Sequence, residues 1–201
     1  VRRGLAPVIA GRSADAIGRL ATELGCEQRI ASLDDPAALG RALAGIDVVL
    51  HCAGPFSVTA APMMRACFAA RVHYLDVTGE IDVFESARPL DADARKAGVT
   101  LCPGVGFDVV ATDCVAAALA EALPDATYLA LGFDSRSGVS GGTLRSTIEG
   151  LPGGGRIRSS GALVTVEHAF RVRDIDFGDG VKHATTIPWG DVSTAHHTTG
   201  I

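Results

Sequence analysis

The stretch DVVLHCAGPF at residues 47–56 decides the fold class of this chain. Asp47–Cys52 is a near-continuous apolar run, which is typical of a strand in a parallel sheet whose two faces are covered by helices. The strand runs directly into Ala53, Gly54 and Pro55, where small residues leave the backbone open and the proline fixes a turn. The stretch therefore predicts a buried parallel strand that ends in a loop suited to close approach by a ligand.

Alternating strand and helix patterns surround this stretch. Ser13 and either Asp34 or Asp35 are suited to cap helices at their start, and Gly25 and Gly98 are suited to end them. We expect strands at residues 5–10, 29–32, 72–76 and 99–102, and helices at residues 14–24, 36–44, 60–70, 81–97 and 108–123. This alternation predicts an α/β fold of βαβ units, a Rossmann-type doubly wound parallel sheet.

The pattern changes after Pro124. A strand over Thr127–Phe133, a helix over residues 142–151, and antiparallel strands over residues 161–166 and 170–174 are expected there. We therefore expect an NAD(P)-binding Rossmann domain over residues 1–124. Residues 125–201 then form the start of an α+β substrate or dimerisation domain.

Both ends of the chain lie inside the expected fold. Residues 1–4 look like the last turn of a helix directly before a strand, whereas a doubly wound fold begins one strand and one helix earlier. The G-x-G-x-x-G phosphate loop does not occur between Val1 and Leu24. We expect the first strand and the glycine-rich loop to precede this chain, and the second domain to continue beyond Ile201.

Arg12 and Ser13 follow the first strand, at the position where an acid commonly binds the ribose hydroxyls of NAD. A guanidinium group there would instead bind a 2′-phosphate, which favours NADP over NAD. The alternative is a solvated arginine beside a serine that only caps a helix. Asp34, after the next strand, has an adenine contact and a helix N-cap as its alternatives, and we favour the N-cap.

The loops after the three later strands supply further candidates, because ligands of doubly wound sheets bind at the carboxyl ends of the strands. The expected cofactor-binding residues are Ala53, Gly54, Pro55, Phe56, Gly79, Glu80, Gly104 and Gly106. A plain Gly-Pro turn is the alternative for the first of these loops. Phe107 and Asp108 are substrate candidates, although Asp108 would equally complement the dipole of the helix it starts. Tyr74, Asp76 and Asp108 are weak candidates for catalysis.

Several motifs together resemble the saccharopine dehydrogenase-like oxidoreductase family, including its trans-acting enoyl reductase branch. The resemblance rests on DVVLHCAGPF at 47–56, VHYLDVTGE at 72–80, PGVGFD at 103–108, SGGT at 140–143 and IPWGDVSTA at 187–195. It implies an NADP-binding Rossmann domain followed by a mixed-sheet substrate domain. Gly142, Trp189 and Asp191 become substrate candidates, with a tryptophan that only packs the sheet as the favoured alternative for Trp189.

The resemblance implies an NADP-dependent reductase that passes a hydride to an enoyl or carbonyl-type substrate, lipid-like or acyl in character. No arginine cluster that would clamp several carboxylates stands out, which argues against an amino-acid substrate. A non-catalytic dinucleotide-binding or scaffolding relative is the alternative. The Tyr-x-x-x-Lys pair of short-chain dehydrogenases is absent, since Thr78 and Gly132 stand four residues after the two tyrosines. The second domain also offers a surface for a homodimer.

Composition excludes several other classes of protein. The net charge of −5 leaves no basic stripe, so nucleic acid is not an expected partner. The five cysteines form no CxxC pair, which fits a reducing cytoplasm, and we expect no metal site. The adjacent His196 and His197 are expected to form a strand pair with one side chain on each face. No apolar run approaches the roughly 20 residues of a membrane helix.

Overall fold

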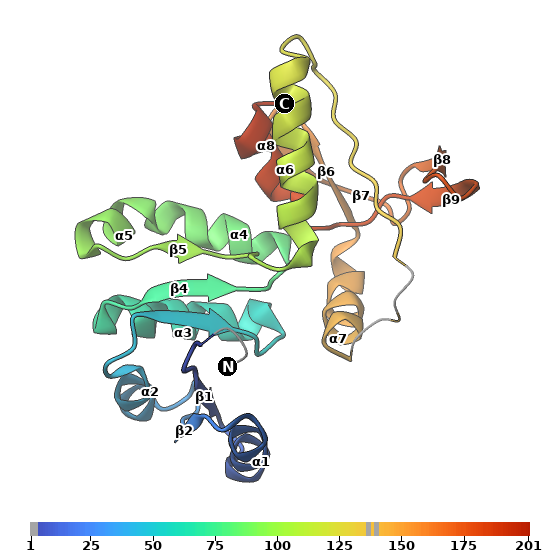
Figure 1. Cartoon of the computed structure of the whole chain (residues 1–201). Coiled ribbons are helices and arrows are strands. Elements are labelled where there is room, and N and C mark those ends of the chain that lie inside the picture. The colour runs from blue at the N-terminus through green and yellow to red at the C-terminus, as the bar shows by residue number, and fades with distance from the viewer. Residues whose placement is uncertain (1–3, 136–137, 139–140) are drawn as a thin grey trace.

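The computed structural model describes residues 4–135, 138 and 141–201 of the chain (Figure 1). The first part contains the strands β1 (Val8–Gly11), β2 (Glu27–Ile30), β3 (Val48–His51), β4 (His73–Asp76) and β5 (Leu101–Cys102). They alternate with the helices α1 (Ala14–Leu24), α2 (Pro36–Leu43), α3 (Phe56–Ala70), α4 (Ile81–Ala87), η1 (Arg88–Leu90), α5 (Asp91–Ala97) and α6 (Phe107–Ala122). The predicted α/β class is confirmed.

All five strands run parallel and form two groups, β2–β1 and β3–β4–β5. Within the described residues, β1 pairs only with β2, and β3 pairs only with β4. A doubly wound sheet of the Rossmann type has the strand order 3-2-1-4-5-6. The two groups match the parts 3-2 and 4-5-6 of that order. The structure thus has the Rossmann-type arrangement that the sequence predicts.

The ends of α1 and α2 are fixed by local capping residues. The Ser13 side chain accepts a hydrogen bond from the first turn of α1, and Gly25 ends the helix in the left-handed region with φ of 64°. Of the two candidates Asp34 and Asp35, Asp35 caps α2, because its Oδ1 accepts two first-turn N–H groups at 3.0 and 2.9 Å. The N-cap role favoured for Asp34 over an adenine contact is therefore wrong. Asp34 Oδ2 instead accepts the Ser32 hydroxyl at 3.3 Å.

Two helices differ from their predicted bounds. The helix expected over residues 81–97 is divided into α4, η1 and α5, with Pro89 in the short 3₁₀ turn between them. Proline has no N–H to donate to a preceding turn, so it interrupts the helix. Helix α3 begins at Phe56 rather than at Ala60, because Glu80, directly before α4, caps it.

The main core lies where α2, α3 and α4 pack against β4. Its buried members are Leu39, Leu43, Phe56, Ala60, Met64, Cys67, Val72, Tyr74, Val83 and Ala87. The apolar residues of α3 recur about one helical turn apart, which places them on one face against the sheet. This packing holds the carboxyl ends of β3 and β4 together at one edge of the sheet.

In its described residues the second part of the chain contains two antiparallel hairpins, two α-helices and one short 3₁₀ helix. Its elements are α7 (Gly141–Gly150), η2 (Leu151–Gly153), β6 (Gly155–Ser159), β7 (Ala162–Val166), β8 (Val172–Asp176), β9 (Val181–Thr185) and α8 (Asp191–Thr199). The predicted strand over Thr127–Phe133 is wrong, because these residues pair with no strand in the described part of the chain. The antiparallel character of this part is confirmed, with β6 pairing β7 and β8 pairing β9.

The prediction of a strand pair at His196 and His197 is also wrong. Both residues lie in α8, with ring centroids 5.1 Å apart. The helix has Asp191 in its first turn and ends at Gly200, which adopts φ of 78°. An acid in the first turn and a left-handed glycine at the end are ordinary start and stop signals of a helix. These signals outweigh the two adjacent histidines, which alone suggested a strand.

Helix α8 packs beside α6 and joins the two parts of the chain (Figure 1). Thr194 and Thr198 donate hydrogen bonds to the two oxygens of Asp113 on α6, at 3.0 and 2.9 Å. Ser193, which is fully buried, donates to Glu85 of α4 at 2.5 Å. The second part is therefore anchored on the helices that follow β4 and β5.

Candidate functional site

The segments that follow β3, β4 and β5 lie side by side at one edge of the sheet. Parallel register places His51 beside Asp76 and Leu75 beside Cys102, so the three strands end together. Ligands of doubly wound sheets bind outside this carboxyl edge. The loops at residues 52–56, 77–80 and 103–106 therefore form the candidate site, together with the loop after β1.

Arg12 and Ser13 stand at the carboxyl end of β1, and both are exposed. Ser13 Oγ accepts the Ala16 N–H at 3.3 Å, which is its capping role. A guanidinium group beside a helix N-terminus is a set of donors that suits a phosphate. The residues present at this strand end therefore fit the 2′-phosphate of NADP.

The loop after β3 exposes its backbone. Ala53 and Gly54 are exposed, and the nearest atom to a Cβ on Gly54 would be in the ring of Phe56, at an ordinary 3.5 Å. Phe56 itself is buried, with its ring edge-on to His51 at 5.6 Å. The small residues thus leave room for a dinucleotide to lie against the backbone, whereas Phe56 anchors the loop in the core.

Tyr74 and Asp76 lie in the core at the end of β4, and both are fully buried. The Tyr74 hydroxyl donates to Asp76 Oδ2 at 2.6 Å. Burial, followed by this hydrogen bond, raises the pKa of Tyr74 far above its ordinary value. Asp76 Oδ1 accepts the N–H groups of Thr78 and Gly104 at 2.9 and 2.8 Å. This pair therefore connects the loops after β4 and β5 from inside the core.

Glu80 closes the loop after β4, and its carboxylate reaches across to the next loop. Oε1 accepts the Phe56 N–H at 2.9 Å, and Oε2 accepts the Ser57 N–H at 2.6 Å. Gly79, beside it, is partly buried, and its carbonyl oxygen would stand 3.3 Å from a Cβ on Gly190. The segment therefore contacts both the loop after β3 and the start of α8.

Close packing explains the two glycines after β5. Gly104 has φ of 76°, and a Cβ there would stand 2.5 Å from the Phe84 ring. A Cβ on Gly106 would lie 3.1 Å from Val77 Cβ, which is tighter than an ordinary contact. Phe107 follows with 71% of its surface exposed. The side chain of Asp108 lies outside the described residues.

Three aromatic rings extend from this loop into the second part of the chain. Phe107 and Phe133 are edge-to-face at 6.5 Å, and Phe133 and Trp189 at 4.5 Å. The Nε1 atom of Trp189 is buried, and no hydrogen-bond partner for it occurs among the described residues. Trp189 therefore lies at the same edge of the sheet as the loop after β5, which is where a residue that contacts the substrate would have to lie.

Asp191, directly after Gly190, accepts a hydrogen bond from the Thr112 hydroxyl of α6. Burial raises the pKa of Asp191 above its ordinary value, and the hydrogen bond from Thr112 opposes this rise. Gly142 is exposed in the first turn of α7, whereas its neighbour Ser140 lies outside the described residues. Asp191 is thus part of the contact between α6 and α8.

Sequence reasoning missed several residues that shape this edge. His51 is 5% exposed, its Nε2 has no partner among the described residues, and burial lowers its pKa. The other residues that sequence reasoning missed are Thr78, Phe84 and Phe133, which contact the segments after β4 and β5. His51 and Thr78 stand inside the quoted motifs and could have been found there. The ring contacts of Phe84 and Phe133 follow from tertiary packing and have no local signal.

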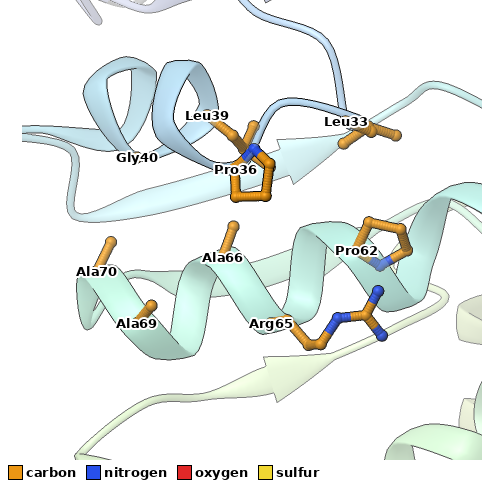
Figure 2. Close-up of a pocket in the computed structure, with 9 residues that line it drawn as sticks. All are labelled: Leu33, Pro36, Leu39, Gly40, Pro62, Arg65, Ala66, Ala69 and Ala70. Carbon is orange, nitrogen blue, oxygen red and sulfur yellow. The ribbon is translucent and has the colours of Figure 1, made fainter.

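Two of the hollows in the described part of the chain lie near the sheet. One, of about 520 Å³, opens between α2 and α3 and contains none of the predicted cofactor residues (Figure 2). Its lining is mostly alanine, leucine and proline, with Arg65 extended along α3. The other, of about 890 Å³, follows β5 between the α4–α5 segment and α6, and it reaches Gly104. Only the second hollow touches the candidate site.

Two other features are absent from the described part of the chain. Among residues 4–135, 138 and 141–201, no group of three or more His, Cys, Asp or Glu side chains is placed to hold a metal ion. Of the helices in this same part of the chain, none combines the length and the apolar character needed to cross a membrane.

Comparison with known families identifies the first part of the chain. The model of the saccharopine dehydrogenase NADP binding domain matches residues 2–102, which include β1 to β5. This chain belongs to the saccharopine dehydrogenase family. NADP is accordingly the dinucleotide of this domain, in agreement with the donor set at Arg12 and Ser13. The predicted family and cofactor are both confirmed.

Individual relatives match at low identity. A protein of Arabidopsis thaliana named mitochondrial saccharopine dehydrogenase-like oxidoreductase is 26% identical over 129 residues, which cover 60% of this chain and 28% of that protein. A protein of Mycobacterium tuberculosis named as a trans-acting enoyl reductase is 31% identical over 125 residues, which cover 58% of this chain and 29% of that protein. The matched regions are thus under a third of either relative.

A solved structure supports the fold over most of the chain. Apo saccharopine dehydrogenase (L-Glu forming) from Saccharomyces cerevisiae superposes with a TM-score of 0.61 at 16% identity. The superposition covers 92% of this chain and 45% of the yeast chain. This chain therefore has the fold of a segment of the yeast enzyme, and that segment is less than half of the yeast chain.

Proposed function

We propose that the protein carrying this chain is an NADP-dependent oxidoreductase that reduces an enoyl or carbonyl-type group on an apolar, acyl or lipid-like substrate. Residues 1–124 would supply the cofactor domain, and residues 125–201 would supply the start of the substrate domain. The observation that carries this proposal is the apolar surface beside the cofactor loops. Its described members are Val77, Phe107, Phe133 and Trp189.

The character of this surface favours an apolar substrate over an amino acid. Phe107 is 71% exposed and begins a row of three rings, so it offers aromatic area for an acyl chain. A dicarboxylate substrate would instead need cationic side chains in paired geometry. The relative named as a trans-acting enoyl reductase supports the same choice.

The chain's own residues would bind and orient the reactants. Arg12 would bind the 2′-phosphate, and the open backbone at Ala53 and Gly54 would lie along the dinucleotide. NADPH supplies the hydride, and its transfer depends on orientation more than on a protein acid. Phe107 and Trp189 would keep water from the reacting groups and hold the substrate between the two parts of the chain.

The test is NADPH oxidation by the full-length protein with enoyl thioesters of increasing acyl length. The kcat/KM should rise with acyl length, because each methylene that is buried contributes about 0.8 kcal/mol of binding free energy. The Phe107→Ala variant should lose this dependence, whereas Phe68→Ala, on a partly buried position of α3 away from the rings, should keep it. Turnover of a saccharopine-forming substrate pair in place of the thioesters would contradict the proposal.

A non-catalytic dinucleotide-binding relative is the second candidate function. The observation that favours it is the complete burial of Tyr74 and Asp76, which keeps two of the weak catalytic candidates from solvent. NADPH binding without oxidation, across thioesters, ketones and aldehydes, would select this candidate. A homodimer through the second part of the chain remains a prediction, and sedimentation of the full-length protein tests it.

A further inference from the structure

Helix α3 takes its N-terminal cap from Glu80, the residue directly before α4. The residue before the helix is Pro55, which makes no side-chain capping bond. The first helical N–H groups of any helix lack partners within that helix. In this chain the N–H groups of Phe56 and Ser57 donate to the two carboxylate oxygens of Glu80, at 2.9 and 2.6 Å. The capping residue therefore lies 24 residues after Phe56 and 23 residues after Ser57 in the sequence.

The Glu80 carboxylate suits this position electrostatically. A helix N-terminus carries a partial positive charge, and a carboxylate there is stabilised by the dipole and by charge-assisted hydrogen bonds. Two N–H donors on two oxygens also fix the orientation of the carboxylate. Glu80 thus links the loop after β3 rigidly to the loop after β4.

Further hydrogen bonds extend this link to the third loop. The Glu80 N–H donates to Thr78 Oγ1 at 3.1 Å, and the Thr78 N–H donates to Asp76 Oδ1 at 2.9 Å. The same Asp76 oxygen accepts the Gly104 N–H at 2.8 Å, and the Asp76 carbonyl oxygen accepts the Val105 N–H at 2.7 Å. One continuous set of bonds therefore joins the loops after β3, β4 and β5.

We propose that Glu80 is a positioning residue for the NADP-binding loop at residues 53–56. It acts through the N-terminus of α3, by holding the exposed backbone of Ala53 and Gly54 at a fixed place beside the other two loops. This inference refines the prediction that Glu80 itself contacts the cofactor. It rests on the proposed function only in taking these loops as the binding surface for NADPH.

The experiment compares Glu80→Ala and Glu80→Gln in the full-length protein, with NADPH affinity measured by fluorescence titration. Glu80→Ala should weaken NADPH binding about tenfold, as expected for the loss of about 1.4 kcal/mol of loop positioning. Glu80→Gln keeps one acceptor oxygen and should lose less. The matched control is Glu23→Ala, an exposed glutamate near the end of α1, which should bind NADPH as the unaltered protein does.

Rescue by a small anion separates positioning from direct contact. In Glu80→Ala the vacated helix N-terminus is a ready site for an anion. Added formate should therefore restore much of the NADPH affinity of Glu80→Ala, with no gain for the unaltered protein or Glu23→Ala. A structural defect alone, or lost contact with the cofactor, would not be repaired in this way.

Two results would overturn the inference. One is unchanged NADPH affinity in Glu80→Ala. The other is a loss of affinity that formate does not reduce and that Glu80→Gln shares in full. If Glu80→Ala does not fold, Glu80→Gln decides by the same affinity measurement. If the proposed reaction is wrong, the protein will bind NADPH without oxidising it. The effect of Glu80 on NADPH affinity can still be measured in that case.

Discussion

Gly104 lies so close to Phe84 that a Cβ atom on Gly104 would stand 2.5 Å from Phe84 Cζ. Gly104 also has φ of 76°, a region that other residues rarely adopt. The loop after β5 can therefore reach Asp76 only with glycine at this position. Backbone strain and overpacking act together here.

Replacement of Gly104 by alanine should lower the free energy of unfolding by about 3 kcal/mol, from αL strain and a forced shift of Phe84. Urea denaturation of the full-length protein measures this loss. Gly98 is the control, because it has φ of 68° with no atom within 4 Å of a Cβ. Gly98→Ala should lose only the strain, about 1 kcal/mol. Equal losses in the two variants would show that the contact with Phe84 is unimportant.

The sequence predicted those elements whose signals are local. Helix α1 has its cap at Ser13 and its left-handed glycine at Gly25, and both were placed correctly. The apolar run at β3 also predicts a parallel strand, and its pairing with β4 confirms this. The predicted cover of both its faces by helices is wrong, because Val48 and Leu50 are 49% and 56% exposed. The fold class and family follow from such local patterns and from motifs within a few residues of each strand end.

What the sequence did not predict depends on long-range contacts. The helix α3 begins four residues before its predicted start, because its cap is Glu80, which lies in the loop after β4. Residues 127–133 have an apolar pattern that resembles a strand, yet Phe133 packs its ring on Trp189 and no strand pairs there. In the same way, the burial of Tyr74 and Asp76 follows from the packing of α3 and the loop after β5, which no short pattern encodes.

Arg12→Ala should weaken NADPH binding far more than NADH binding. Charge-assisted hydrogen bonds contribute about 1.5–3 kcal/mol, so the NADPH dissociation constant should rise roughly 10- to 100-fold. NADH lacks the 2′-phosphate and should bind almost unchanged. Titration of both cofactors in the full-length protein measures the ratio. Arg19→Ala, an exposed arginine on α1, is the control and should alter neither. Equal weakening of NADPH and NADH by Arg12→Ala would exclude the phosphate role.

Asp191 should make the stability of the α6–α8 contact depend on pH. Burial raises the folded-state pKa of this acid above its unfolded value, with the nearby Asp113 charge adding to the rise and Thr112 opposing it. A raised folded pKa means that the folded state holds the proton more tightly. Ionisation of Asp191 therefore removes stability as the pH rises from the unfolded pKa through the folded pKa.

Asp191→Asn stays neutral and keeps an oxygen for the Thr112 hydroxyl. The free energy of unfolding should match that of the unaltered protein below about pH 3.9, the ordinary aspartate value, and exceed it increasingly at higher pH. Urea denaturation across this range measures the difference. Asp125→Asn, at an exposed turn after α6, should show no such trend. A difference that does not change with pH would contradict this account of Asp191.

Glu85 should be the main anchor between the two parts of the chain. Its Oε1 accepts the fully buried Ser193 hydroxyl at 2.5 Å and Arg158 Nη2 at 3.4 Å. Arg158, with a side chain only 14% exposed, also donates to the Val192 and Gly161 carbonyl oxygens. Removal of the carboxylate would leave a buried hydroxyl and a partly buried cation without their shared acceptor.

Glu85→Ala should therefore lower the free energy of unfolding by about 2 kcal/mol, because unsatisfied buried donors are costly. Asp82, on the same helix, is the matched control: its pair with Arg156 spans 3.9 Å and its side chain is 80% exposed. Exposed ion pairs of this kind contribute roughly 0–1 kcal/mol, so Asp82→Ala should lose little. Urea denaturation of both variants gives the comparison, and Glu85→Gln should fall between them because it keeps an acceptor for Ser193. If Glu85→Ala and Asp82→Ala lost the same small amount, the second part of the chain would be held on α4 and α6 by the apolar packing of Gly190 against Phe84 and by the bonds to Asp113 instead.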